Sequence, residues 1–226
     1  EGNTPGKPLT FLDAHIKCGD SLVGVFDLDV LQQGIPDDAF KPVTGDDKRV
    51  AAGARIRNRQ ERTGQAALAL AADPGALDAL AQQWRAELTE AGEDTPAQVR
   101  KKRAAYARLQ EAERGQRRLC DLWTAAFFTP LTGANEAAGR IVTSAVLRAV
   151  RSDPAAVSAP LLGWAEAVSA ENRFFHWPLE FPEVMVERGG FDAFVGNPPF
   201  MGGQKIKGNL GTWYHDYLLA GWEHCS

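Results

Sequence analysis

The pattern of apolar and polar positions divides the chain into three parts. Residues 45–170 are rich in Ala, Leu, Arg, Glu and Gln, which all favour helices. Residues 1–44 and 171–226 contain shorter apolar runs that end at Gly, Pro or Asp. The pattern therefore predicts an α/β domain, made of residues 1–44 and 171–226, that is interrupted by a long all-α insertion over residues 45–170.

The insertion carries clear start and stop signals for helices. The expected helices cover about residues 47–72, 76–91, 96–128, 135–151 and 160–170. The third has the strongest start, because Thr95 can cap it, Pro96 suits the first turn and Gln98 can complete a capping box. In the second, apolar residues at helical spacing predict a core-facing side: Leu77, Leu80, Trp84 and Leu88. An aromatic-rich helix is also expected over residues 210–222.

The flanking parts contain two expected strands. Residues 15–18 alternate in polarity and stop at Gly19-Asp20, and residues 191–195 are aromatic and β-branched. The second strand must end at Asn197, because the prolines that follow cannot donate to a ladder. In an open parallel sheet, ligands bind beyond the carboxyl ends of the strands, so Asp20, just past the first expected strand, is well placed to contact a nucleotide. The predicted fold class is therefore α/β, with part of a Rossmann-like sheet.

A polar corner follows the second expected strand and reads Asn197-Pro198-Pro199-Phe200. Methyl transfer to a planar exocyclic amine fits these residues. The amide oxygen of Asn197 and the carbonyl of Pro198 can each accept one amine hydrogen, and Phe200 can stack on the ring. Such a corner acts through positioning and aimed dipoles, without a strong base.

These residues carry a resemblance to a known family. Asn-Pro-Pro-Phe after a Phe-Asp-x-x-x-Gly segment resembles the catalytic motif of amino-directed, S-adenosylmethionine-dependent methyltransferases, above all the DNA adenine-N6 enzymes. Residues 16–24 and 174–184 are similar to segments that precede this motif in large restriction-modification (type IIG-like) and phage-defence adenine methyltransferases.

The resemblance implies roles for individual residues. It makes Asn197, Pro198, Pro199 and Phe200 catalytic, and it places Asp20 near the adenine amino group of the cofactor S-adenosylmethionine. The implied partner is double-stranded DNA from which the target adenine is flipped into the corner.

The resemblance covers about the first 25 and the last 55 residues. The chain lacks two features of the family: the glycine-rich turn after the first strand, and the acidic residue that binds the ribose hydroxyls of the cofactor. We therefore expect the cofactor-binding first half of the domain to lie upstream of Glu1. The expected partners of the chain include the missing N-terminal and C-terminal parts of a parent chain. The isolated chain is expected to be inactive.

Charge is distributed unevenly along a chain whose net charge is −4. Basic residues gather at residues 48–62 and 100–118. Such a face could bind DNA phosphates without sequence preference, but solvated faces with acidic neighbours are the favoured interpretation. Lys205 and Lys207 lie close to Asn197 in sequence and are predicted to contact nucleic acid, with a routine surface loop as the alternative.

Composition narrows the remaining possibilities. Three cysteines form no metal-binding spacing and suit a reducing cytoplasm: Cys18, Cys120 and Cys225. His176, Glu180 and Glu183 lack a supporting second His or Cys, so structural roles and no metal are expected. No apolar run approaches the roughly 20 residues of a membrane span, so no membrane partner is expected.

Two other functions stay open at this point. A protein-glutamine methyltransferase also transfers a methyl group to a planar nitrogen, that of a side-chain amide, and has a similar motif. The basic insertion and residues 19–22 argue against this function. A helical DNA-binding or assembly module that keeps a degenerate methyltransferase corner would be non-catalytic.

Overall fold

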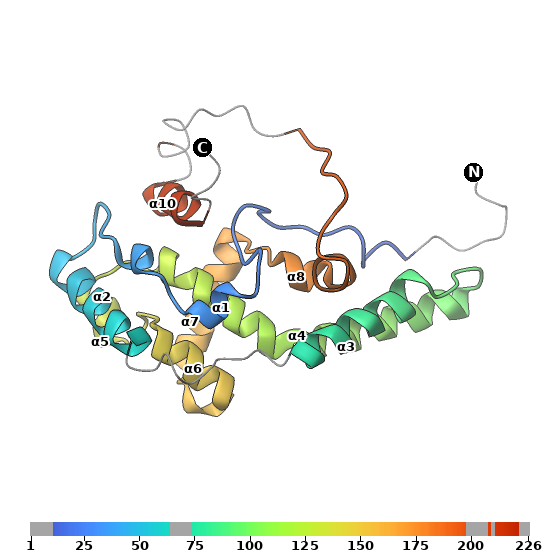
Figure 1. The fold of residues 1–226 in the computed structure, drawn as a ribbon, viewed down its shortest axis with the longest axis horizontal. Coiled ribbons are helices and arrows are strands. Elements are labelled where there is room, and N and C mark those ends of the chain that lie inside the picture. The colour runs from blue at the N-terminus through green and yellow to red at the C-terminus, as the bar shows by residue number, and fades with distance from the viewer. Residues whose placement is uncertain (1–10, 64–73, 198–207, 209–210, 222–226) are drawn as a thin grey trace.

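The computed structural model describes residues 11–63, 74–197, 208 and 211–221. Helices dominate this part of the chain (Figure 1). In chain order they are α1 (Val30–Gln33), α2 (Lys48–Thr63), α3 (Pro74–Trp84), α4 (Pro96–Phe128), α5 (Gly133–Ala137), α6 (Ser144–Ser152), α7 (Ala159–Asn172), α8 (Trp177–Glu180) and α10 (Thr212–Gly221). Short 3-10 turns cover Asp37–Phe40 and Pro154–Ala156, and π-helical turns cover Arg85–Thr89 and Glu183–Glu187.

The expected α/β fold with a Rossmann-like sheet is wrong for the part of the chain that the structure describes. No strand forms there, and residues 15–18 and 191–197 are both irregular. A single parallel bridge joins Asp20 to Phe174. The physical reason is that a short apolar run becomes a strand only when a neighbouring ladder satisfies its backbone, and an isolated pair of short strands is marginal in water.

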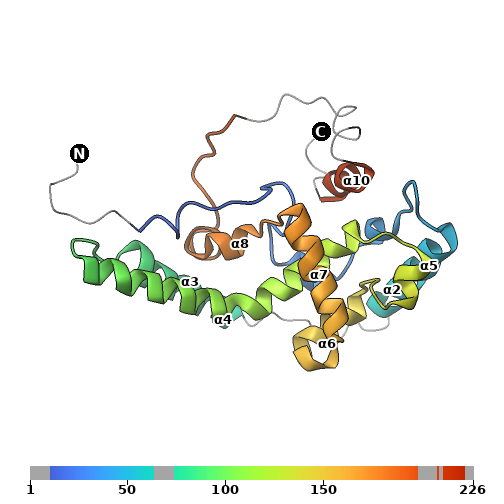
Figure 2. The same ribbon diagram turned by 180° about the vertical axis from the view of Figure 1, so that it is seen from behind.

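Helix α4 forms as the sequence predicts and runs along much of the length of the molecule (Figure 2). The backbone N–H of Gln98 donates to Thr95 Oγ1 at 3.3 Å, and the N–H of Thr95 donates to Gln98 Oε1 at 2.9 Å. The capping box is thus complete, and the helix ends at Phe128, two residues before a proline. Local signals suffice here because they act within one turn of the chain.

The other predicted helices form with altered boundaries. The expected helix over residues 135–151 is divided into α5 and α6, because Gly139 takes a left-handed φ of 65° between them. Helix α3 ends at Trp84 and passes into the π-helical turn. The last part of the helix expected over 47–72 lies outside the described residues, and α2 ends at Thr63.

The apolar side chains form two clusters, one at each half of α4. The smaller packs α3 and its following turn against the first half of α4 and includes the predicted Leu80, Trp84 and Leu88, all buried. The larger surrounds the second half of α4 and takes in α6 and α7, with further side chains from both flanking parts: Val23, Val25, Phe174, Leu179 and Tyr217. Residues from all three predicted parts of the chain therefore share one core.

Backbone hydrogen bonds join the two flanking parts directly. The N–H of Phe175 donates to Val23 O at 2.7 Å, and the N–H of Trp177 donates to Val25 O at 3.1 Å. Between them, a side chain at Gly24 would place its Cβ 2.1 Å from the carbonyl oxygen of Phe175, and the backbone φ at Gly24 is 148°. Glycine at this position permits the close approach of the two segments.

Candidate functional site

Asn197 is the last residue of the described range 74–197 and is exposed to solvent. Within the described ranges it takes part in no hydrogen bond or ion pair. The other predicted residues near it lie outside the described part of the chain: Pro198, Pro199, Phe200, Lys205 and Lys207. Of the predicted site residues, Asn197 and Asp20 are therefore the two that the structure describes.

Aromatic packing holds the segment that leads to Asn197. The ring of Trp177 lies 5.8 Å from the ring of Phe191 and 5.5 Å from that of Phe194, both edge-on. Phe181 meets Phe191 at 5.3 Å. Edge-to-face pairs at these distances are favourable beyond their buried area. Residues 191–195, which were expected to form a buried strand, are thus a segment without regular secondary structure that is held by aromatic contacts. The segment leads away from the helical core (Figure 1).

Asp20 lies on the opposite flanking segment and is half-buried. Its carboxylate oxygen Oδ1 accepts hydrogen bonds from the backbone N–H of Leu22 at 3.1 Å and from the hydroxyl of Tyr214 at 3.3 Å. Its own N–H donates to the carbonyl of Arg173 at 2.8 Å. The carboxylate is therefore already oriented by protein donors and faces α10.

Helix α10, which follows the motif, is fastened to the same segment by a second tyrosine. The Tyr217 hydroxyl accepts the N–H of Gly24 at 2.9 Å and donates to the carbonyl of Gly24 at 2.5 Å. Burial raises the pKa of Tyr217 to about 12, with the charge of Asp20 acting in the same direction. Burial and the negative charge of Asp20 also raise the pKa of Tyr214. Both phenols therefore stay protonated at neutral pH and act as donors.

Trp177 connects the two predicted site residues, which do not touch each other in the described structure. Its indole N–H donates to the carbonyl of Ser21 at 2.9 Å, and its ring packs against Phe194. One side chain thus reaches the residue after Asp20 and the arm that ends at Asn197. The sequence placed Trp177 in a family-like segment, but no pattern indicated a pairing across 156 positions.

His176 occupies the core beneath this junction, with both ring nitrogens engaged. Nδ1 accepts the backbone N–H of Val25 at 3.0 Å, and Nε2 lies 3.1 Å from Asp121 Oδ1. An acceptor role for Nδ1 fixes the proton on Nε2, which donates to the carboxylate. Ser169 adds a hydroxyl donor to the same oxygen of Asp121 at 2.6 Å. His176 therefore fastens residues 23–25 to α4.

The described residues do not form a complete pocket for S-adenosylmethionine. Such a pocket uses a glycine-rich turn between a strand and a helix, and the described ranges contain no strand. The glycines near Asp20 serve protein packing instead, since a Cβ at Gly19 or Gly24 would collide with Phe175. Among the described residues, no group of His, Cys, Asp and Glu is placed to hold a metal ion. No helix in this part of the chain has the length and apolar character to cross a membrane.

Comparison with known proteins gives one match. No curated protein and no solved structure matches the chain. The model of the Eco57I restriction-modification methylase family matches residues 133–225, a range that includes the Asn-Pro-Pro-Phe motif and α10 but not Asp20. Residues 133–225 are therefore similar to a restriction-modification methylase, and this similarity supports a DNA methyltransferase of that type.

Proposed function

We propose that this chain is part of a site-specific DNA methyltransferase that methylates the N6 amine of adenine, within a cytoplasmic restriction-modification or phage-defence system. The observation that carries the proposal is the match of residues 133–225 to the Eco57I methylase family, because that range contains Asn197-Pro198-Pro199-Phe200. The proposed methyl donor is S-adenosylmethionine, which methylases of this kind use.

The acceptor chemistry belongs to the Asn197 corner. Asn197 is exposed and its amide makes no hydrogen bond within the described part of the chain, so its oxygen remains able to accept an amine hydrogen. In the proposal, the carbonyl of Pro198 accepts the second hydrogen, and Phe200 stacks on an adenine flipped out of duplex DNA. Lys205 and Lys207 would contact the phosphates beside the flipped base.

The donor side of the site is incomplete in this chain. Asp20 is proposed to face the adenine of the cofactor, and its fixed orientation by Leu22 and Tyr214 supports a positioned carboxylate. The described residues supply no glycine-rich cradle. The proposal therefore requires N-terminal and C-terminal parts of a parent chain to complete the pocket, and it predicts weak cofactor binding by the chain alone.

The test is transfer of a tritiated methyl group to duplex DNA by the longest natural protein that contains this chain. Asn197→Ala is expected to lower the rate at least tenfold, because it removes an acceptor that orients the amine. It should leave the melting temperature unchanged, since Asn197 is exposed and makes no hydrogen bond in the described structure. Gln110→Ala, which removes an exposed amide from α4, is the matched control.

The same assay separates the alternatives. Label in protein rather than DNA would identify a glutamine methyltransferase. DNA binding without transfer by the longest protein would identify the non-catalytic helical module. A rate that is equal in wild type and Asn197→Ala would remove Asn197 from the mechanism.

A further inference from the structure

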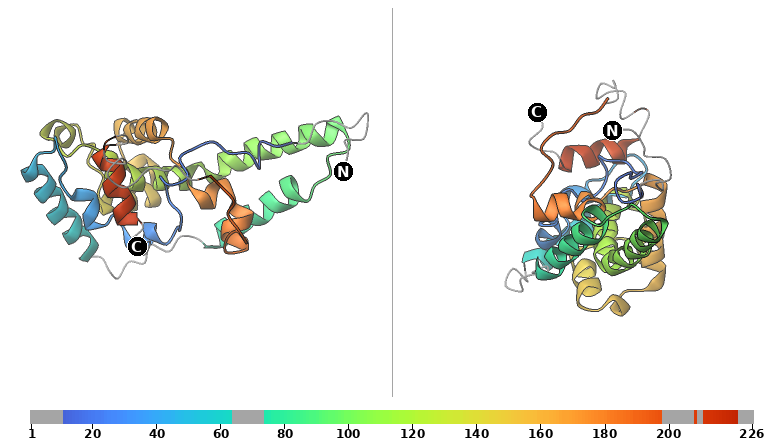
Figure 3. Two further views of the ribbon diagram at one scale, coloured as in Figure 1. Left: turned by 90° about the horizontal axis from the view of Figure 1, so that it is seen from above. Right: turned by 90° about the vertical axis from the view of Figure 1, so that its right-hand side faces the viewer.

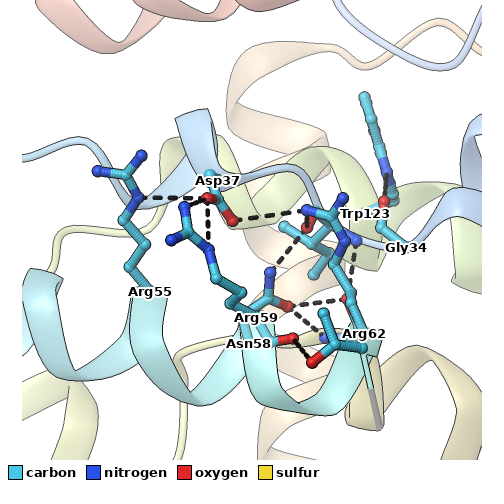
Figure 4. Close-up of polar contacts among 10 residues, drawn as sticks. Gly34, Asp37, Arg55, Asn58, Arg59, Arg62 and Trp123 are labelled. Carbon is cyan, nitrogen blue, oxygen red and sulfur yellow. Dashed lines mark hydrogen bonds and ion pairs between the residues drawn. The ribbon is translucent and has the colours of Figure 1, made fainter. Parts of the chain in front are cut away.

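One face of α2 concentrates positive charge around a single carboxylate (Figure 4). Arg55, Arg59 and Arg62 all form ion pairs with Asp37, at 3.5 Å for Arg55 and for Arg62. One carboxylate neutralises one guanidinium, so the three arginines retain an excess of positive charge. Arg55 and Arg59 still expose 51% and 62% of their side chains.

Asp37 remains an anion over the whole neutral range, so this charge balance holds. Partial burial alone would raise its pKa, but the hydrogen bond and charge of Arg59, with the charges of Arg55 and Arg62, hold the pKa below its usual value. The next carboxylate, Asp38, does not line the hollow that Arg55 and Arg59 line, but another hollow, which Arg62 and Trp123 also line.

A hollow of about 670 Å³ opens beside the exposed arginines. Lys48, Arg55 and Arg59 line it with cationic groups, and Phe40 and Ile56 add apolar surface. Lys48 is exposed and forms no ion pair among the described residues. A concave surface that combines guanidinium groups with apolar carbon suits a phosphate attached to a sugar, because arginine binds phosphate oxygens in pairs.

A buried side chain of α2, one helical turn from both Arg55 and Arg62, holds the helix against its neighbours and so helps to fix the direction of the arginines. Asn58 is fully buried, donates to the carbonyl of Ile35 at 2.8 Å and accepts the N–H and hydroxyl of Ser144 at 2.9 and 2.8 Å. The Ser144 hydroxyl in turn accepts the N–H of Ile35 at 2.9 Å. A binding face that is ordered before the ligand arrives loses less entropy on binding.

Two arginines of α4, Arg108 and Arg114, differ from these in their charge balance. Arg108 pairs with Glu87 and Arg114 with Glu111, at 2.6 and 2.7 Å, so each has a carboxylate of its own. Their side chains are 61% and 60% exposed, much like those of Arg55 and Arg59. Exposure alone therefore does not distinguish these two arginines from Arg55 and Arg59, whereas a carboxylate of their own does.

We propose that the face of α2 formed by Lys48, Arg55 and Arg59 binds the phosphate backbone of duplex DNA, without reading its sequence. The inference rests on the proposed function for its partner, since a DNA methyltransferase must hold a duplex while a base is presented to the Asn197 corner. Figure 3 shows α2 at one end of the molecule, with the tip of the α3 and α4 hairpin at the other. A contact on α2 would therefore extend the DNA interface over the helical block.

The test is the salt dependence of binding between this chain and a short fluorescein-labelled DNA duplex, followed by anisotropy. The slope of log K against log salt should become less steep by about two for Arg55→Gln/Arg59→Gln, because each lost phosphate contact releases about one fewer counterion. Lys48→Gln should lower the slope by about one. The control double variant Arg108→Gln/Arg114→Gln removes the same charge and should leave the slope unchanged.

Folding is controlled in two ways. Arg55→Lys/Arg59→Lys keeps the charge and should keep the slope, and Lys48→Gln loses no ion pair of the described structure. Equal slope changes in the α2 and α4 double variants would overturn the inference, as would a chain that does not bind the duplex. Competition by inorganic phosphate as strong as by unlabelled duplex would also overturn it. Asn197→Ala should leave the slope intact, so failure of this inference is distinct from failure of methyl transfer.

Discussion

The buried polar side chains of this molecule depend on completed hydrogen bonds, and His176 is the clearest case. It links Val25 to Asp121 inside the core, so its removal leaves the Val25 N–H without a partner and takes a donor from the Asp121 carboxylate, which keeps the Ser169 hydroxyl. We expect His176→Leu to lower the free energy of unfolding by about 2–4 kcal/mol. Urea denaturation measures the loss, and His215→Leu, at a half-exposed ring on α10, should cost less than about 1 kcal/mol. Equal losses for the two variants would contradict the role of His176.

Glu183 presents the opposite situation, a buried carboxyl that lacks a full set of partners. Its Oε2 atom has no hydrogen-bond partner among the described residues, and burial raises the pKa of the group. A raised folded pKa means that the contribution of this group to stability is present below the unfolded pKa and is lost as pH rises through the folded value. Glu183→Gln, which stays neutral, should therefore raise the melting temperature at neutral pH.

The pH dependence distinguishes this effect from a general gain in packing. The advantage of Glu183→Gln should shrink as pH falls to about 4, where the wild-type carboxyl is protonated as well. Thermal melts measure this change between neutral pH and about pH 4, which is near the ordinary pKa of a carboxyl group. Glu166→Gln, on the exposed surface of α7, is the control and should change little. A loss of stability at neutral pH would contradict the account.

At the scale of elements, α10 depends on two tyrosines for its position. Tyr217 is buried, packs edge-on against Phe127 at 5.2 Å and bonds both backbone groups of Gly24. Tyr217→Phe should lower stability by about 1–2 kcal/mol and speed hydrogen exchange at residues 20–25. Tyr214→Phe removes one bond to Asp20 and should have a smaller effect. Unchanged exchange at residues 20–25 would mean that α10 is held in another way.

The same scale explains which elements the sequence predicts. Helix α4 is read from Thr95, Pro96 and Gln98 because a capping box is completed within four residues. The strand at residues 191–195 is not read correctly, since aromatic residues favour strands only where a neighbouring strand exists. Here Phe191 and Phe194 pack on Trp177 instead. No local sequence pattern encodes that contact, because residues 178–190 separate the partners.

At the scale of the whole molecule, α4 contributes side chains to both apolar clusters, its first half to the smaller and its second half to the larger. The flanking parts contact each other through Val23, Val25 and residues 174–177, which are joined by backbone hydrogen bonds. The sequence anticipates that Asp20 and Asn197 belong to one region, and the structure joins their segments through Trp177. It does not anticipate Trp177, Tyr214 or Tyr217 as the connection, because each bond crosses more than 150 residues.

The charge of the whole chain is a poor guide to its partner. A net charge of −4 does not indicate a nucleic-acid binder, yet α2 keeps three arginines around one carboxylate. Proteins contact DNA through local positive faces, so the distribution of charge matters more than its sum. On α2 three arginines share one carboxylate, whereas Arg108 and Arg114 of α4 each pair with a carboxylate of their own.

Asn197 is proposed to orient an adenine N6 amine for methylation. The most direct measurement is the nucleoside composition of unmethylated duplex DNA after incubation with S-adenosylmethionine and the longest natural protein that contains this chain. If Asn197 has this role, we expect N6-methyladenine in the DNA treated with the wild-type protein. We expect almost none with Asn197→Ala at equal protein stability. Methylation on cytosine, or N6-methyladenine at the same level with Asn197→Ala, would contradict it.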